Sequence, residues 1–418
     1  MVEKRTPLAV ADAVQKVMEH KLEGQQEFVS IFDSCDRFLS EDLKADHDVP
    51  RFDRSAYDGY AVKAEDLAGC SKENPLRLKV IDEIGAGYVS KKSVGRFEAV
   101  RIMTGAMLPP DCDAVVMLED VIEASQLDDK HITISKPVFK GENLSFKGED
   151  VQAGAVLVKK GTKINPGIVA LLATFGYEQV PVAKKPIIGV FATGSELLEV
   201  HEELEEGKIR NSNAYMVMAQ IKQAGAEAVY FGKLADVLDE SYQAMKKALD
   251  TVDILLTTGG VSVGDYDLLP EIYRKLGAEV LFNKIAMRPG SVTTVAVLNG
   301  KLLFGLSGNP SACFVGFELY ARPIIRTMLF SEKPHLTKAS AILKEDFPTT
   351  NAFTRFIRSR AVLEDGVLYT GPSGTDKSSI VSSIANANAL TILPGGINGF
   401  KKGEQVQVIL LDDSANTY

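Results

Sequence analysis

The run Ile187-Ile188-Gly189-Val190-Phe191-Ala192, which ends at Thr193-Gly194, decides the fold. Six apolar or small residues before a turn signal predict a strand that is buried on both faces. Downstream, Asn211-Ser212-Asn213 offers helix-capping side chains and Gly225 a helix stop, so a helix should follow this strand. Strand and helix then keep alternating. This alternation predicts a three-layer α/β/α domain over residues 181–328, with a mostly parallel sheet between its helices.

Later strands of this domain end in similar turns. A strand predicted at 253–258 runs into Gly259-Gly260, and a strand at 302–306 runs into Ser307-Gly308-Asn309-Pro310. One helix should open at Ser241, and another should stop at Gly277. Parallel sheets bind ligands beyond the carboxyl ends of their strands, so we expect the glycine-bearing turns to gather around one ligand site.

The sequence on either side of this domain has a different character. Residues 48–141 contain short β-rich runs and no strong helix, which indicates a separate β-rich domain. Its flanks, 7–47 and 142–180, share no obvious core with it and are predicted to pair as one discontinuous domain. Residues 335–418 again form β-rich runs between Gly, Pro and Asn turns, which predicts a small C-terminal β-barrel or sandwich. A multidomain chain, α/β plus β, agrees with its length.

Composition narrows the classes of function. A net charge of −9 argues against a nucleic-acid partner, because binding to the phosphate backbone needs a basic surface. The N-terminus lacks the apolar core of a signal peptide, and no window approaches the roughly 18 apolar residues that span a bilayer. We therefore expect a cytoplasmic protein with no membrane partner.

The cysteines are widely separated in the sequence. They are Cys35, Cys70, Cys112 and Cys313, and they form no Cys-x-x-Cys pair. Neither a zinc site nor a disulfide framework is indicated by this spacing. We expect buried, reduced thiols.

Several motifs occur together in a fixed order. The stretch from Val49 to Val62 contains Asp58-Gly59-Tyr60-Ala61-Val62 after a Pro-x-Phe-Asp-x-Ser segment. Six more motifs lie at 101–106, 113–117, 192–197, 258–265, 287–290 and 308–310. Each motif alone is weak, but in this order and spacing they make the chain resemble the molybdopterin molybdenumtransferase (MoeA) family. The resemblance covers about residues 7–330 and extends more loosely to the C-terminus.

The resemblance implies a fold and a reaction. The fold would combine a central MogA-like domain, the β-rich domain, an elongated discontinuous linker domain and a C-terminal β-barrel. The reaction, a step of molybdenum cofactor biosynthesis, hydrolyses adenylylated molybdopterin, inserts molybdate (or tungstate) into its dithiolene and releases AMP. The family also implies a homodimer with the active site at the subunit interface, and transient contact with the molybdopterin adenylyltransferase. Mg²⁺ is the implied cofactor, and because it prefers oxygen ligands and bridges phosphate oxygens, carboxylates are expected at the site.

Site residues follow from the motifs that match the family. The catalytic candidates are Asp58, Thr104, Glu196, Asp236 and Asp267. Glu196 and Asp267 are assigned to the metal or its bound water, and Asp236 to their support. Asp58, with the Thr104 hydroxyl nearby, is assigned to substrate positioning or proton transfer. The substrate-binding candidates are Gly259, Gly260, Ser262, Lys284, Arg288, Gly308, Asn309, Pro310 and Ser378.

The chain departs from the family in two turns. Where the family commonly has Lys-Pro-Gly-Lys-Pro, this chain has Arg288-Pro289-Gly290-Ser291-Val292, and where the family has Leu-Pro-Gly-Asn-Pro, this chain has Leu306-Ser307-Gly308-Asn309-Pro310. Arg288 keeps a positive charge and can hold an oxyanion through two donors, but Ser291 supplies no charge. The expected molybdate subsite therefore loses a cation, and Lys284 is the nearest one preserved.

Simpler interpretations stay open at several positions. Asp236 is also explained as a neighbour of a helix N-cap, and the Gly-Gly turn as an ordinary connection. Arg355, Arg358 and Arg360 lie close together on a predicted strand, and such a charge run is usually a solvated face. Two other functions also stay open. One is a molybdopterin adenylyltransferase, which usually consists of the α/β domain alone, and the other is a non-catalytic dimeric scaffold.

Overall fold

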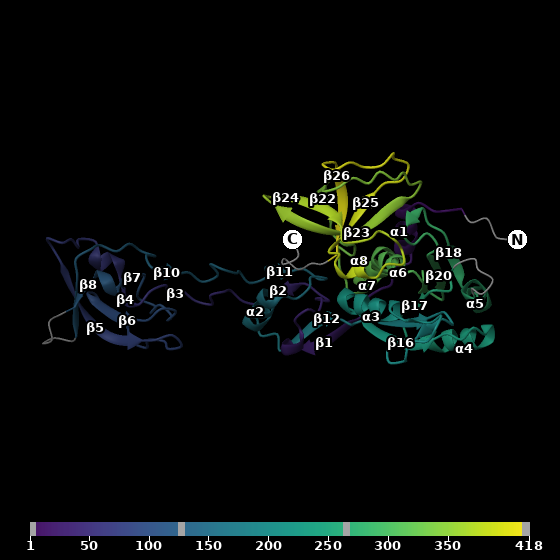
Figure 1. Ribbon diagram of the computed structural model, residues 1–418. Coiled ribbons are helices and arrows are strands. Elements are labelled where there is room, and N and C mark those ends of the chain that lie inside the picture. Colours follow the sequence, from purple (N-terminus) through teal and green to yellow (C-terminus); the bar gives the residue numbers. More distant parts are fainter. Residues whose placement is uncertain (1–5, 124–129, 262–267, 412–418) are drawn as a thin grey trace. The chain divides into compact units, whose positions relative to one another are not determined.

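A six-stranded sheet forms the centre of the α/β domain (Figure 1). The computed structural model describes residues 6–123, 130–261 and 268–411. The strand order of this sheet is β16-β13-β17-β21-β20-β18, in which the first four strands are parallel, β20 is antiparallel to both of its neighbours, and β18 forms the edge. The predicted mostly parallel sheet is thus confirmed. The bounds are Ile187–Ala192 (β13), Glu227–Lys233 (β16), Ile254–Thr258 (β17), Glu279–Phe282 (β18), Thr294–Leu298 (β20) and Lys301–Leu306 (β21).

Helices cover both faces of this sheet. One face packs against α1 (Val10–Glu19), α3 (Asn213–Ala224), α6 (Pro310–Gly316) and α7 (Arg322–Met328), and the other packs against α4 (Leu238–Leu249) and α5 (Leu269–Leu276). Along β17, Ile254 and Leu256 belong to the first core and Leu255 to the second. The strand is therefore apolar throughout because both of its faces are buried, which confirms the three-layer prediction.

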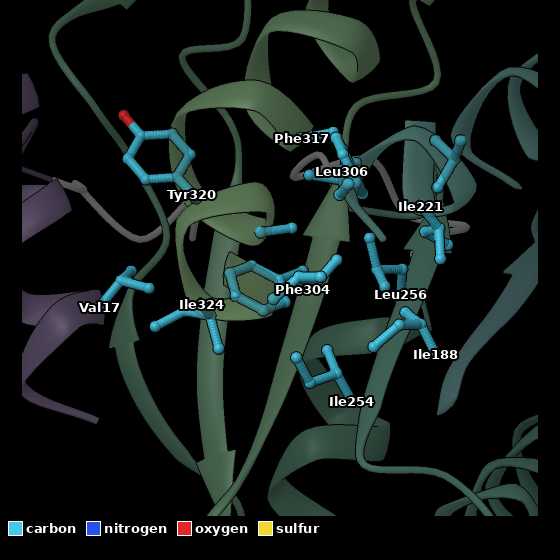
Figure 2. Packing of buried hydrophobic residues seen from close by; sticks show 14 of the residues in the cluster. Val17, Ile188, Ile221, Ile254, Leu256, Phe304, Leu306, Phe317, Tyr320 and Ile324 are labelled. Atoms are coloured by element: carbon cyan, nitrogen blue, oxygen red, sulfur yellow. The ribbon is translucent and has the colours of Figure 1, made fainter. Parts of the chain in front are cut away.

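Figure 2 shows the larger of these two cores. Ile188, Ile254 and Phe304 come from the strands, and Ile221 and Ile324 come from the helices that cover them. All five side chains are fully buried. Each such side chain contributes about 1.5–3 kcal/mol relative to its exposure to water, so this core fixes the ends of the strands from which the site is built.

Glycines end two helices at the predicted positions. Gly225 stops α3 with a φ of 101°, and Gly277 stops α5 with a φ of 72°, both in the left-handed region that favours glycine. The start of α4 was predicted wrongly, since the helix begins three residues before Ser241. Its N-cap, Val237, makes no side-chain cap bond, so the sequence carries no capping signal there. Between α6 and α7 the helix continues as a π-helical segment, Phe317–Ala321.

The chain divides into two compact units. The first comprises Met1–Glu41, Lys160–Ala170 and Glu178–Tyr418, and the second comprises Asp42–Lys159 and Leu171–Tyr177. Besides the α/β domain, the first unit contains an antiparallel ribbon of β1 (Gln26–Ser30) and β12 (Gln179–Ala183). The finer division into four domains stays a prediction.

The second unit is β-rich, as the sequence predicted for its central part. Its main sheet has the strand order β7-β4-β6-β5-β9-β8. The bounds are Gly59–Val62 (β4), Leu76–Ile84 (β5), Glu98–Ile102 (β6), Ala114–Met117 (β7), Val121–Glu123 (β8) and His131–Ile134 (β9). Two short pairs complete the unit, β2 (Leu43–Lys44) with β11 (Val156–Val158) and β3 (Arg54–Ser55) with β10 (Leu144–Ser145).

The C-terminal strands close into a five-stranded barrel. β23 (Thr354–Glu364) pairs with both β24 (Val367–Pro372) and β25 (Ala389–Leu393), and β22 (Lys338–Leu343) and β26 (Gln405–Leu410) complete the circle. Of the two predicted architectures, the barrel is confirmed. The two-residue strand β19 (Met287–Arg288) adds to the start of β23 and so connects the α/β domain to the barrel.

Three of the four cysteines match the prediction. Cys70, Cys112 and Cys313 are buried and free, and burial raises the pKa of the Cys112 thiol to about 12. Cys35 is exposed, so the prediction was wrong there. It follows a 3₁₀ turn, Ile31–Asp33, whose Phe32 is itself exposed. Within the described ranges, no helix is both long and apolar enough to cross a membrane.

Candidate active site

A cavity of about 1020 Å³ lies at the carboxyl ends of the four parallel strands. It is lined by the turns that follow β13, β16, β17 and β21. These turns contribute Thr193–Glu196, Leu234–Asp236, Gly259–Val261 and Ser307–Asn309. The glycine-bearing turns therefore gather at one edge, as expected for a parallel sheet covered on both faces.

Glu196 reaches the cavity from the turn after β13. Thr193 ties this turn to β17, because its backbone N–H donates to the Thr258 carbonyl at 3.1 Å. Gly194 has a φ of 135°, and a Cβ added there would lie 2.5 Å from one carboxylate oxygen of Glu196. Any other residue at position 194 would be strained at this φ and would displace the Glu196 carboxylate from its present position. Among the described residues, no protein group donates a hydrogen bond to the Glu196 carboxylate.

Asp236 provides a second carboxylate in the turn after β16. The turn is held to β13 by Leu234, whose N–H donates to the Ala192 carbonyl at 2.8 Å, and to α4 by Ser241, whose hydroxyl donates to the Ala235 carbonyl at 2.5 Å. Asp236 directly precedes the N-cap of α4 but makes no capping bond itself. Within the described ranges its carboxylate also has no protein partner, which makes it available to a cation or water.

The turn after β17 brings two backbone segments very close together. Gly259 and Gly260 have φ values of 100° and 67°. A Cβ added to Gly259 would lie 2.6 Å from the Thr193 hydroxyl oxygen, and one added to Gly260 would lie 3.0 Å from it. Both the conformation and the close approach require glycine, so this turn presents backbone rather than side chain to the cavity.

The turn after β21 is held by hydrogen bonds that its sequence does not suggest. The Asn309 N–H donates to the Ser307 hydroxyl oxygen at 3.3 Å, and the Asn213 side-chain amide donates to the Gly308 carbonyl at 2.8 Å. The contact with the Ser307 hydroxyl helps to hold this turn. Pro310 begins α6 immediately after the cavity lining.

A loop of the barrel packs against the start of α6. The Ser311 N–H donates to the Ser378 carbonyl at 3.1 Å, and its hydroxyl donates to the Ile380 carbonyl at 3.0 Å. Ser378 itself is not among the residues that line the cavity. It contacts the helix that follows the lining turn, through its backbone.

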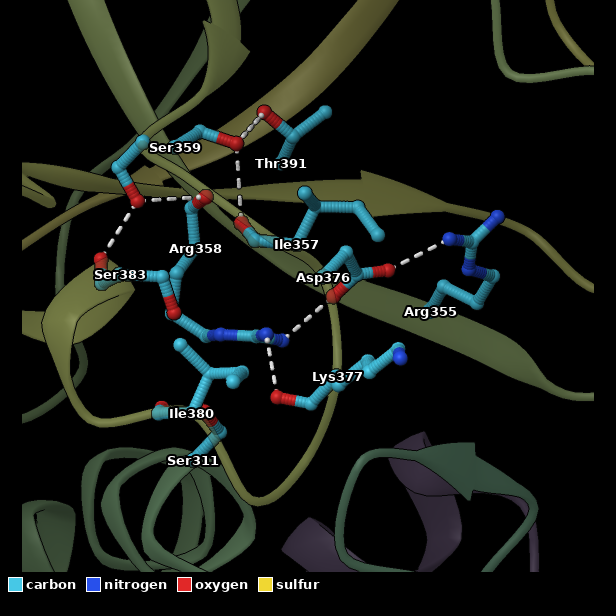
Figure 3. A network of polar contacts seen from close by, with 11 residues as sticks. Ser311, Arg355, Ile357, Arg358, Ser359, Asp376, Lys377, Ile380, Ser383 and Thr391 are labelled. Atoms are coloured by element: carbon cyan, nitrogen blue, oxygen red, sulfur yellow. Dashed lines mark hydrogen bonds and ion pairs between the residues drawn. The ribbon is translucent and has the colours of Figure 1, made fainter.

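Figure 3 shows what fixes this loop. Asp376 lies between two guanidinium groups, at 2.6 Å from Arg355 and 2.7 Å from Arg358, and Arg358 also donates to the Lys377 carbonyl. Arg358 is 2% exposed. The interpretation of the arginine run as a solvated face was therefore wrong for Arg358, because the partner that permits its burial lies in a loop far along the sequence. Arg360 is exposed, as that interpretation predicts.

In the second unit, Asp58 and Thr104 lie side by side. One Asp58 carboxylate oxygen accepts hydrogen bonds from the Thr104 hydroxyl at 2.7 Å and from the Thr104 N–H at 2.6 Å. These bonds, the hydroxyl first, hold the pKa of the Asp58 carboxyl below its usual range, although the side chain is exposed. The predicted proximity of these two residues is seen, and their catalytic roles stay predictions.

Some predicted site residues are not brought to this cavity. Lys284 is half-buried just before β19 and Arg288 is exposed within it, and neither is part of the lining that the structure describes. Ser262 and Asp267 lie outside the described residues. The assignment of Asp267 to the metal therefore stays a prediction.

Sequence reasoning missed the apolar wall of the cavity. It is formed by Ile209, Leu234, Leu268, Leu269, Ile272 and Val292. Most of these residues look like ordinary core positions in the sequence, so no motif marks them. Leu268 and Leu269 line the cavity beside the Gly-Gly turn, which only the fold reveals.

Family models match the chain in three consecutive segments. A MoeA N-terminal region (domain I and II) matches residues 8–176, a probable molybdopterin binding domain matches 189–327, and a MoeA C-terminal region (domain IV) matches 340–411. A molybdopterin molybdenumtransferase of Bacillus subtilis (strain 168) is 57% identical over 98% of this chain and 96% of its own length. The chain belongs to the MoeA family.

Other comparisons place the whole length of the chain in the MoeA family. A molybdopterin molybdenumtransferase of Staphylococcus aureus (strain COL) is 51% identical over 99% of this chain and 98% of its own length. Two crystal structures of a molybdopterin biosynthesis MoeA protein from Pyrococcus horikoshii superpose with TM-scores of 0.86 and 0.82, at 32% and 31% identity. They cover 98% and 97% of this chain and 100% of their own. The MoeA resemblance predicted from the motifs is confirmed.

Proposed function

We propose that this MoeA chain is a Mg²⁺-dependent molybdopterin molybdenumtransferase that acts on adenylylated molybdopterin and molybdate and releases AMP. The observation that carries the proposal is a pair of carboxylates, Glu196 and Asp236, without protein partners in the described structure, in a cavity lined by glycine turns. Relatives that are 57% and 51% identical are named for the same transferase activity. The reaction belongs to molybdenum cofactor biosynthesis.

The side chains present fit a magnesium ion that is shared with substrate. Mg²⁺ is usually held by one or two carboxylates together with water and substrate phosphate, rather than by a cage of protein ligands. In the described part of the chain, no three His, Cys, Asp or Glu side chains come together to hold a metal. Glu196 would supply a protein oxygen to the ion, and Asp236 would support it by holding metal-bound water. When bound, the ion would neutralise charge that develops on the phosphoanhydride.

Each part of the cavity has a distinct task in this proposal. Gly259, Gly260 and Gly308 let a phosphate approach the backbone closely, because none of them carries a side chain. The apolar wall, including Ile209 and Ile272, would pack against the planar part of the substrate and exclude water. The volume of about 1020 Å³ is sufficient for a nucleotide-linked pterin.

The proposal also includes a homodimer and a role for Asp58 and Thr104 in substrate positioning or proton transfer. Two hydrogen bonds fix one Asp58 oxygen, while the side chain stays exposed and able to meet a ligand. Such an oriented carboxylate suits substrate positioning or proton transfer. Light scattering on the purified chain would measure the oligomeric state.

The test is AMP release by the purified protein with adenylylated molybdopterin, Mg²⁺ and molybdate. Glu196→Gln keeps the size of the side chain but removes its charge, and it should lower the rate at least about a hundredfold. Asp236→Asn, in a supporting position, should lower it about tenfold. Asp239→Asn is the matched control, because Asp239 lies on α4 outside the lining and pairs with Lys275. Full activity in both cavity variants would refute the proposal.

A further inference from the structure

The Glu196 carboxylate projects from the start of a short two-stranded ribbon. After Glu196 the chain forms β14 (Leu197–Leu198), which pairs in parallel with β15 (Ile209–Arg210). The Ile209 N–H donates to the Glu196 carbonyl at 2.9 Å, and Ile209 also lines the cavity. Because no protein donor holds the Glu196 carboxylate itself in the described structure, the direction of this side chain depends on what fixes the ribbon.

A second carboxylate, Glu199, anchors the ribbon directly after β14. Tyr230 of β16 donates its hydroxyl to one Glu199 oxygen at 2.7 Å, and Tyr215 of α3 donates to the other at 3.1 Å. All three side chains are half-buried, and the two rings lie 5.9 Å apart between their centroids. Burial, and then the bond to Glu199, raise the pKa of the Tyr230 hydroxyl, so it stays protonated and donates at neutral pH.

Asn211 joins this cluster to the start of α3. Its side-chain amide donates to the Tyr230 hydroxyl at 2.9 Å, and its side-chain carbonyl accepts from the Ala214 N–H at 3.2 Å. Its own N–H donates to the Leu198 carbonyl at 2.7 Å. Asn211 is 1% exposed. A buried amide that uses both of its ends connects its partners rigidly, so the ribbon, β16 and α3 are held as one body.

The same segment reaches a second turn of the cavity. Asn213, the first residue of α3, donates its side-chain amide to the carbonyl of Gly308. The N-cap between the two asparagines, Ser212, makes no side-chain cap bond. The run Asn211-Ser212-Asn213, predicted only to start a helix, therefore also connects the turn after β13 with the turn after β21.

Other contacts with the ribbon come from surface lysines. Lys208 donates to the Ser195 carbonyl at 2.6 Å, and Lys233 donates to the Leu197 carbonyl at 2.9 Å. Both contacts are exposed to solvent. A long lysine side chain loses conformational entropy in such a contact and restrains the backbone weakly. The half-buried bonds of Glu199 to two aromatic residues are the stronger anchor.

We propose that Glu199 is a positioning residue, which holds the Glu196 carboxylate towards the cavity through its bonds to Tyr215 and Tyr230. Outer partners of this kind orient the groups that contact a metal, and their loss weakens metal binding. The inference rests on the proposed function, because it names what orients the carboxylate that serves the ion. Glu199 is not among the described residues that line the cavity, so it acts through Glu196 and not on the substrate.

Hydrogen exchange of the Ile209 amide in the metal-free full chain tests the positioning directly. Glu199→Gln keeps the size of the side chain but removes the charge that both hydroxyls bind, and it should speed this exchange at least about tenfold because the ribbon opens more readily. Glu203→Gln is the matched control, since Glu203 is an exposed carboxylate between β14 and β15 with no hydrogen bond or ion pair among the described residues. It should change the exchange rate by less than about twofold.

The Mg²⁺ requirement of AMP release separates positioning from a loss of stability. A variant that is only less stable lowers the rate with its folded fraction and leaves the Mg²⁺ concentration for half-maximal rate unchanged. Glu199→Gln should raise that concentration about fivefold, less than the loss of Glu196 itself. Tyr230→Phe keeps the ring, removes one donor to Glu199, and should shift both measurements in the same direction. Combined with Glu199→Gln it should add little, because both variants break the same network.

The outcomes distinguish this inference from the proposed function. If the wild type released no AMP, the proposed function would fail, and exchange in the metal-free protein would still decide whether Glu199 fixes the ribbon. Equal exchange of the Ile209 amide in Glu199→Gln and Glu203→Gln would overturn the inference. Faster exchange without a change in the Mg²⁺ requirement, or fully additive effects of Tyr230→Phe and Glu199→Gln, would also overturn it.

Discussion

Asp376 in the barrel loop and Glu196 in the large cavity are carboxylates of the same unit with opposite surroundings. Asp376 is bound by Arg355 and Arg358, one to each oxygen. Glu196 lines a cavity, and its carboxylate accepts no protein hydrogen bond in the described structure. A carboxylate saturated by guanidinium groups holds the fold together, while one with open lone pairs can take a cation or water. The presence or absence of protein partners therefore distinguishes a carboxylate that stabilises the fold from one that can bind a ligand.

The same difference applies to the loops that carry them. The barrel loop is fixed by side chains, since Asp376, Ser373 and Ser311 all make hydrogen bonds in or to it. The turns of the cavity are fixed by backbone bonds, by a few side-chain bonds from Asn213 and Ser241, and by glycines in close contact with Thr193. As a result, substitutions in the barrel network should reduce stability, and substitutions at the cavity carboxylates should reduce activity.

Arg358→Met should have the largest effect on stability. It removes the buried partner of Asp376 and of the Lys377 carbonyl, and breaking a buried ion pair costs about 3 kcal/mol or more. Urea unfolding would measure the loss. Arg360→Met is the control, because Arg360 is exposed on the same strand and should change the free energy of unfolding by less than about 0.5 kcal/mol. Equal losses would mean that the network does not stabilise the barrel.

Gly259→Ala should have the next largest effect. An alanine at position 259 would be strained in the left-handed backbone conformation, and its Cβ would lie 2.6 Å from the Thr193 hydroxyl oxygen. Together these effects should lower the free energy of unfolding by about 2–3 kcal/mol. Gly277→Ala shares the left-handed conformation but has nothing within 4 Å, so it should cost only about 1 kcal/mol. Thermal unfolding measures the loss of stability in each of the two variants. A Gly277→Ala loss as large as that of Gly259→Ala would show that the close approach to Thr193 is not tight.

Thr104→Val should have the smallest effect and tests an intermediate case, an exposed carboxylate with two donors. The variant loses the hydroxyl donor but keeps the N–H donor, so the pKa of Asp58 should rise toward its ordinary value of 3.8 without reaching it. Because the folded pKa is depressed, the stability that these bonds supply is present above the unfolded pKa and is lost as the pH falls through the folded pKa. Carbon-detected NMR titration measures the pKa of Asp58 in the wild type and in Thr104→Val. An unchanged pKa in the variant would contradict the role of the hydroxyl.

Much of the α/β domain could be predicted because its signals are local. The run at Ile187–Ala192 is buried on both faces, and Gly225 and Gly277 stop their helices because a left-handed residue is required there. The gathering of the turns followed from strand direction alone. The antiparallel strand β20, its neighbour β18 at the sheet edge, and the barrel strand β22 were not predicted, since they are short or only weakly alternating.

What could not be predicted depends on partners distant in sequence. The burial of Arg358 requires Asp376, which comes from a loop after the next strand, and no spacing rule connects them. Likewise, the sequence marks Glu196 and Asp236 by motif but does not show that their carboxylates lack protein partners. That observation needs the fold, because it depends on which donors surround each oxygen.

The central claim, that the partner-free Glu196 carboxylate serves a magnesium ion, is tested most directly by measuring AMP release as a function of Mg²⁺ concentration. The account predicts that Glu196→Gln raises the Mg²⁺ concentration for half-maximal rate at least about tenfold, the loss of one charged ligand, while Asp239→Asn leaves it unchanged. An identical Mg²⁺ dependence in the wild type and Glu196→Gln would contradict the account.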